Sequence, residues 1–149
     1  MKLTEHFELR EFTISDYAVR HGIDNTPNEL IIGNLKMLCE YTLEPLREIV
    51  KRPIIITSGY RCYDLNKAIG GSDTSQHVDG KAADIIVPNM SVDELFELGS
   101  KYVPHDQIIH EFARWVHVSY SNPLRLQKLW AVKENGRTVY KHESPQKVS

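Results

Sequence analysis

The segment 58-SGYRCYDLNKAIGGSDTSQHVDGKAAD-84 lies between two apolar runs and indicates how the centre of the fold is built. The isoleucine-rich run 53–58 predicts a buried strand, and the run 82–87 predicts a second strand. Between them, residues 62–69 have the pattern of a helix that a glycine pair ends, and residues 72–80 form a polar loop. The stretch therefore predicts two strands joined by a turn, a short helix and a polar loop.

Upstream, residues 27–50 carry leucines at roughly helical spacing and predict one long helix. Thr26 is a suitable N-cap and Pro27 suits the first turn, whereas Pro45 is expected to kink or break the helix. Shorter helical turns are predicted before it, at 8–12 and 15–21.

Downstream, the remaining elements in chain order are a helix at 91–102, strands at 107–112 and 115–120, a short helix at 123–129 and a hairpin at 130–140. Ser91 is a suitable N-cap for the first of these, and Asn135-Gly136 is a strong signal for the last hairpin. Residues 1–140 are therefore predicted to form one α+β domain, with a mostly antiparallel central sheet flanked by helices. Residues 141–149 are predicted to be a disordered tail.

Composition and charge exclude several classes of protein. The chain has 149 residues, 41% of them hydrophobic and 26% charged, with a formal net charge of -2. Because it has no basic stripe and no apolar run long enough to span a bilayer, we expect neither a nucleic-acid nor a membrane partner. Glu5 and Glu8 lie where an export signal would be apolar, so we expect cytoplasmic location at synthesis. Cys39 and Cys62 are expected to be reduced.

Three polar side chains in apolar surroundings raise the question of a shared metal ion. His77 lies in the polar loop, and Asp84 interrupts an apolar strand, where a carboxylate is costly unless it is paired or bound to a metal. His117 lies between two valines and shares its strand face with Trp115 and Ser119. Two imidazoles and one carboxylate are a standard ligand set for catalytic zinc. From the residues alone, one zinc site and three unrelated side chains both remain open.

The long motif around these residues resembles the zinc D-Ala-D-Ala carboxypeptidases, peptidoglycan peptidases with a hedgehog-type fold. The matching residues are Ser58, Gly59, Tyr60, Arg61, Leu65, Asn66, Gly70, Gly71, Ser75, His77, Gly80, Ala82, Asp84 and His117. The resemblance covers about residues 5–140 and is to phage- and prophage-type members with a single catalytic domain. It implies one zinc ion held by His77, Asp84 and His117, and hydrolysis of an amide bond in a cell-wall stem peptide.

A zinc peptidase also needs a general base, and Glu111 is the candidate. It lies six residues before His117, across the predicted hairpin turn. A hairpin centred near Arg114 would set Glu111 opposite His117, whereas a centre half a step earlier would set His110 there instead. The pattern alone leaves both registers open. The resemblance favours Glu111, because hedgehog-type relatives have a glutamate six residues before the last histidine ligand.

The resemblance also implies roles for residues around the metal. Arg61 is expected to contact substrate as a clamp for a carboxylate or a carbonyl, and Ser75 to orient His77 or to line the cleft. Trp115 stands where some relatives have a second histidine. It is expected to form an apolar wall for substrate, unless the histidine's role passes to His110.

These features predict a monomeric zinc metallopeptidase whose partner is a peptidoglycan peptide, reached after release from the cytoplasm. D-Ala-D-Ala carboxypeptidase and endolysin-type endopeptidase activities both remain open. The alternative is a catalytically inactive, zinc-bearing module that binds cell wall or serves as a structural phage component.

Overall fold

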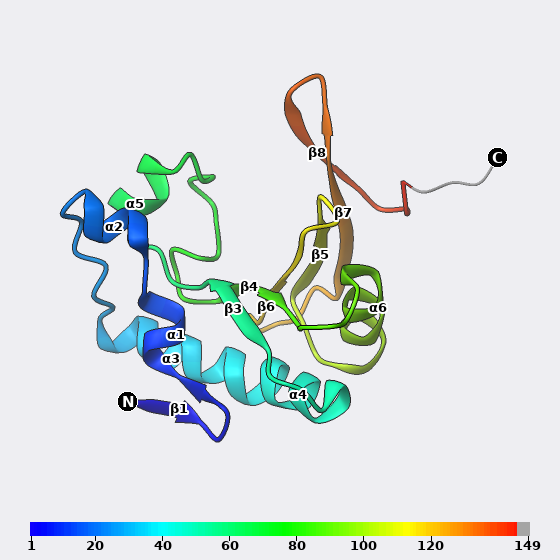
Figure 1. The fold of residues 1–149 in the computed structure, drawn as a ribbon, viewed down its shortest axis with the longest axis horizontal. Helices are drawn as coiled ribbons and strands as arrows, with labels where there is room; N and C mark the ends of the chain where they lie inside the picture. Colours follow the sequence, from blue (N-terminus) through cyan, green and yellow to red (C-terminus); the bar gives the residue numbers. More distant parts are fainter. Residues whose placement is uncertain (146–149) are drawn as a thin grey trace.

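A six-stranded sheet forms the centre of the computed structural model, which describes residues 1–145 (Figure 1). Its strands are β3 (Ile55–Ser58), β4 (Ala82–Ile86), β5 (Gln107–Glu111), β6 (Trp115–Ser119), β7 (Gln127–Glu134) and β8 (Arg137–Lys141). They lie in the order β3-β4-β6-β5-β7-β8, and neighbouring strands are antiparallel except β5 and β7. The predicted α+β class with a mostly antiparallel sheet is confirmed.

Helices cover one face of this sheet and continue past its β3 edge. They are α1 (Leu9–Thr13), α2 (Asp16–Arg20), α3 (Glu29–Leu38), the π-helical turn η1 (Cys39–Leu43), α4 (Glu44–Val50), α5 (Tyr63–Ala68) and α6 (Val92–Tyr102). A small two-stranded sheet, β1 (Lys2–Thr4) and β2 (Phe7–Glu8), precedes them. In Figure 1, α3, η1 and α4 form one long rod along the sheet, and α6 lies beside β5 and β7.

Side-chain alternation along the strands gives the sheet two different faces. The face toward the helices carries the fully buried residues Ala83, Ile85, Ile108, Val116 and Val118. They join leucines of the helical rod and Phe96 of α6 in one hydrophobic core. The intervening residues, among them Asp84 and His117, point to the opposite face.

The predicted helix over 27–50 is built in three pieces. It begins at Glu29 because Asn28, rather than Thr26, caps it, with its side chain accepting a hydrogen bond from a backbone N–H of the first turn. The π-helical turn η1 comes immediately before Pro45, which lies in the first turn of α4. Proline lacks an N–H and its ring crowds the carbonyl four residues earlier, so a wider turn accommodates it without breaking the rod.

Two local predictions are wrong because pairing between distant segments decides the structure. The run 53–58 does not form a buried strand: β3 lies at the edge of the sheet with one neighbour, and Ile55 is 42% exposed. The helix expected at 123–129 does not form either. Instead Gln127 opens β7, which pairs in parallel with β5 and satisfies backbone groups that β5 would otherwise leave open.

The C-terminal part of the sheet follows the sequence pattern more closely. The predicted hairpin over 130–140 is present, and its Asn-Gly turn joins β7 to β8. The predicted tail, 141–149, overlaps the structure in part: Lys141 still belongs to β8, and residues 146–149 lie outside the described residues. Within residues 1–145, no helix is both long and apolar enough to cross a membrane.

Candidate metal centre

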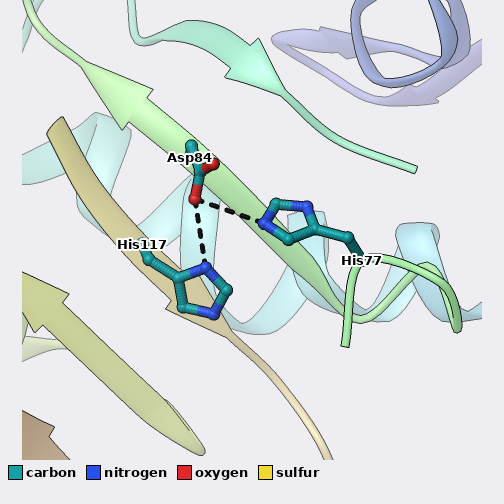
Figure 2. Close-up of side chains that lie close together, drawn as sticks. All are labelled: His77, Asp84 and His117. Atoms are coloured by element: carbon teal, nitrogen blue, oxygen red, sulfur yellow. Dashed lines mark hydrogen bonds and ion pairs between the residues drawn. The ribbon is translucent and has the colours of Figure 1, made fainter. Parts of the chain in front are cut away.

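The three predicted metal ligands lie together on the sheet face opposite the core, as Figure 2 shows. Asp84 on β4 and His117 on β6 are directly opposed in the strand register, and His77 approaches from the loop before β4. One ligand atom from each residue lies within 4.8 Å of the others, and all three residues are buried. The structure therefore brings the three predicted ligands together, one from a loop and two from neighbouring strands.

Two glycines let the backbone around His77 approach its neighbours closely. A Cβ atom on Gly59 would lie 2.6 Å from the backbone of Phe12, so no side chain fits there. Gly80 has a φ of +69°, and a Cβ atom there would lie 2.7 Å from the side chain of Ile31. The two glycines therefore allow the backbone on either side of His77 to pack closely against helices, Gly59 against α1 and Gly80 against α3.

The His77 ring is oriented by a hydrogen bond between its Nδ1 and the carbonyl oxygen of Gly59, at 2.7 Å. Because a carbonyl only accepts, Nδ1 carries the proton, and Nε2 has a free lone pair in the neutral ring. That lone pair lies 3.3 Å from Oδ1 of Asp84. Burial lowers the pKa of His77 despite the opposing charge of Asp84, which disfavours a proton between the two atoms. Two electron-rich atoms this close favour a bound cation, so the donor set fits zinc.

The Asp84 carboxylate is shared by both imidazoles. Nδ1 of His117 lies 3.0 Å from the same Oδ1 that faces His77. Burial acts to raise the pKa of Asp84, but the two histidines outweigh it and hold this pKa well below its usual range. Burial likewise acts to lower the pKa of His117, and the hydrogen bond and charge of Asp84 outweigh it, so this pKa is raised. Asp84 is therefore anionic at neutral pH, as a metal ligand must be.

The β5–β6 register places Glu111, the predicted base, diagonally across from His117. Glu111 is paired with Trp115, and the residue that faces His117 is Ile109. The hairpin is therefore centred on Ala113, and both registers considered from the sequence are wrong. Residues 112–114 form the turn, and Phe112 and Ala113 have a φ of 56° each, although neither is a glycine or an asparagine that would mark such a turn.

Glu111 still reaches the metal centre, because alternation places it on the same face as His117. Its Oε1 lies 3.6 Å from Nδ1 of His117. Burial, followed by the negative charge of Asp84, raises the pKa of Glu111 to about 6. A carboxyl group with a pKa near neutrality can both take up and return a proton.

Trp115 and His110 lie on opposite faces of the sheet. The indole Nε1 of Trp115 is buried and has no hydrogen-bond partner of good geometry within residues 1–145. Its N–H still lies near enough to the Glu111 carboxylate to act to lower the pKa of Glu111. The indole packs against Phe112 in a T-shaped arrangement, with ring centroids 5.9 Å apart. Its role as an apolar wall for substrate stays a prediction. His110 instead faces α6, where its Nε2 lies 2.6 Å from Asp93, so it cannot replace a second histidine of the site.

Arg61 borders the site, whereas Ser75 supports the loop. Burial lowers the pKa of Arg61, against the charges of nearby Asp84 and Glu111. Its Nε–H is buried and has no hydrogen-bond partner within the described residues. The predicted contact of Arg61 with substrate stays a prediction. Ser75 accepts a hydrogen bond on its Oγ from the backbone N–H of His77 at 3.2 Å. Its predicted contact with substrate stays a prediction.

Two residues near the centre were not predicted from the sequence. The charges of Glu111 and Asp84 add to burial in raising the pKa of Tyr140, so β8 reaches toward the site. Asp106, immediately before β5, accepts a hydrogen bond from the side chain of Gln76 in the loop at 2.8 Å. Both depend on contacts between distant segments, and a charged residue next to an apolar run was the one available sign for Asp106.

Comparison with known proteins gives one finding. A family model described as Peptidase M15 matches residues 5–119. The matched span runs from just before β2 to the end of β6 and contains the three ligand positions and Glu111. No curated protein matches the chain.

Proposed function

The chain belongs to the peptidase M15 family, and on that premise we propose that it is a zinc-dependent peptidase that hydrolyses an amide bond in peptidoglycan stem peptides. The observation that carries this proposal is the buried set of His77, Asp84 and His117, with Glu111 at 3.6 Å from His117. Structural zinc sites have four protein ligands, whereas catalytic sites have three and an open position. Three ligands beside a carboxyl group of raised pKa correspond to the catalytic kind.

A zinc ion held by these three residues would supply the Lewis acidity that polarises a carbonyl and lowers the pKa of a water molecule. Glu111 would serve as the general base, taking a proton from the attacking water and returning it to the departing amine. Its pKa of about 6 suits both transfers at neutral pH. Asp84 and His117 lie on paired strands, so the ligand geometry is largely preorganised before substrate arrives.

Arg61 is the proposed clamp for substrate. Its guanidinium lies close enough to Asp84 and Glu111 for their charges to affect its pKa, and its Nε–H is unpartnered within residues 1–145. In a carboxypeptidase it would pair with the carboxylate of the terminal D-Ala, and in an endopeptidase with a carbonyl. The endolysin-type setting, the phage origin and the monomeric state are proposed on the sequence resemblance alone.

A catalytically inactive, wall-binding module is the second candidate. Trp115, in place of a second histidine, favours it, because one group that could stabilise the transition state is missing. Glu111 counts against it, because a carboxyl group whose pKa is raised to about 6 beside the metal centre suits proton transfer, which a binding module does not need.

The test is zinc content measured beside activity, on protein purified without chelator or affinity histidines. Purified peptidoglycan is assayed for released D-Ala and for new amino termini, before and after chelation and return of zinc. One zinc per chain with chelator-sensitive release supports the peptidase, and the product identifies the bond. One zinc without release would favour the binding module, and absence of stoichiometric zinc would overturn both.

A further inference from the structure

Asp106 is a buried carboxylate outside the ligand set, at the entrance of β5. It is 1% exposed, yet it carries a full complement of hydrogen bonds. The backbone N–H and Nε of Arg125 each donate to its Oδ1 at 2.9 Å. Nη2 of Arg125 donates to its Oδ2 at 2.7 Å. This bidentate pair with an arginine is a rigid arrangement that few side chains other than aspartate or glutamate could make.

The remaining donor to Asp106 comes from the loop that carries His77. Nε2 of Gln76 donates to Oδ2 of Asp106 at 2.8 Å. The backbone oxygen of Gln76 accepts hydrogen bonds from Asp79 at 3.2 Å and from Lys81 at 3.0 Å, which closes the turn around His77. Gln76 therefore connects this turn, through its side chain, to a fixed carboxylate.

The backbone of Asp106 is in turn tied to the strand of the other histidine ligand. Its N–H donates to the carbonyl oxygen of Ser119, the last residue of β6, at 2.8 Å. Its carbonyl oxygen accepts from Gln127, the first residue of β7, at 2.9 Å. Asp106 thus joins the His77 loop to the frame made by β5, β6 and β7.

The Gln76 side chain also has an unfavourable feature. Its Oε1 is buried and has no hydrogen-bond partner within residues 1–145. An unsatisfied buried polar atom costs roughly 1–3 kcal/mol. A side chain kept only for packing would avoid this cost, and local violations of this kind are expected where a residue serves a site.

We propose that Asp106 is a positioning residue for the metal centre, and that it acts through Gln76 to hold His77 in place against Asp84 and His117. The inference rests on the proposed binding of zinc. Without the tether, the loop would be free to shift relative to the sheet, and zinc binding would have to order it. Groups that orient metal ligands in this way typically contribute 10- to 100-fold to metal affinity.

The experiment is a measurement of zinc affinity for Gln76→Ala, made on the full chain by competition with a chromophoric chelator. Gln107→Ala is the matched control, because it removes an identical side chain whose amide bonds to Gln127 instead of to Asp106. We expect Gln76→Ala to bind zinc about 10-fold or more weakly than the wild type does. We expect Gln107→Ala to bind zinc within about 2-fold of the wild type.

A double-mutant cycle with Asp106→Asn tests whether Asp106 acts through Gln76. If it does, adding Asp106→Asn to Gln76→Ala should weaken zinc binding further by less than about 3-fold. Wild-type affinity in Gln76→Ala, or an equal loss in Gln107→Ala, would overturn the proposal. Additive effects in the double variant would also overturn it. A wild-type protein that binds no zinc would instead refute the proposed function, so the two failures are distinguishable.

Discussion

Asp84 and Ile85 are neighbours on β4 and face opposite sides of the same sheet. Ile85 is fully buried in the core and stabilises the fold by removing apolar surface from water. Asp84 is only 8% exposed, and the two imidazoles beside it, rather than apolar contacts, offset the cost of burying its charge. Neighbouring residues of β4 therefore have different roles, Ile85 in stability and Asp84 in the proposed metal centre. Substitutions on the core face should lower stability, and substitutions on the other face should lower zinc binding and activity.

The largest effect is expected from Asp84→Ala, which removes the anion shared by both imidazoles. Two histidines alone are an incomplete ligand set, so stoichiometric zinc and measurable hydrolysis should both be lost. Zinc analysis of the purified variant beside the peptidoglycan assay checks this, with His77→Ala expected to behave in the same way. A variant that retains one zinc per chain would remove Asp84 from the ligand set.

Glu111→Gln should separate chemistry from metal binding on the same face. Glutamine keeps the size of the side chain but cannot accept the proton, so kcat should fall by about 10²- to 10⁴-fold. Zinc content should stay at the wild-type value, because Glu111 is not among the three ligands. Steady-state kinetics with zinc analysis on one preparation test this, and full activity in the variant would exclude Glu111 as the base.

Ile85→Ala is the matched change on the core face. Truncating a fully buried isoleucine removes apolar contacts and leaves a cavity, so the free energy of unfolding should fall by about 2–5 kcal/mol. Zinc affinity under folding conditions should be unchanged. Denaturant unfolding of the metal-free protein, with a zinc titration beside it, measures both quantities. A loss of zinc affinity as large as the loss of stability would show that the two faces are coupled.

The smallest expected effect depends on pH and concerns Asp106. Burial acts to raise its pKa, but hydrogen bonds from Arg125 and Gln76 outweigh it and hold this pKa at about 2, below the reference value of 3.8. A lowered pKa stabilises the folded protein above about pH 4, and about 2 kcal/mol is lost as the pH falls toward about 2.

The comparison of wild type with Asp106→Asn isolates this contribution. The difference in their free energies of unfolding should shrink as the pH falls from 4 toward 2, because asparagine does not titrate there. Urea unfolding of both metal-free proteins at a series of pH values provides the measurement. A difference that stays constant over this range would mean that the folded protein does not lower the pKa of Asp106.

The ligands could be predicted from the sequence because each one departs from its local surroundings. Asp84 interrupts an apolar strand, His117 lies between two valines, and His77 lies in a motif of recognisable form. The β5–β6 register could not be predicted, since Phe112 and Ala113 adopt positive φ without any residue that signals it. The predicted pairing of Glu111 with His117 differs from the observed pairing with Trp115 by two residues on β6. Because side chains alternate every second residue, that prediction still placed Glu111 on the same face as His117.

Contacts between distant segments account for the other differences. The parallel pairing of β7 with β5 overrides the helical pattern at 123–129, and the position of β3 at the edge of the sheet leaves its isoleucines partly exposed. The link from Gln76 to Asp106 joins residues 30 positions apart. Neither propensity nor local spacing carries information about such pairs.

The placement of ligands on a loop and on two strands has a further consequence in polymer terms. An ion held by His77, Asp84 and His117 would close two rings in the chain, and the larger one would span the 33 positions between Asp84 and His117. Closing a ring lowers the entropy of a flexible chain by an amount that grows only slowly with ring length. The ion would therefore act as a removable cross-link, and chelation would restore the conformational entropy that closing the two rings removes.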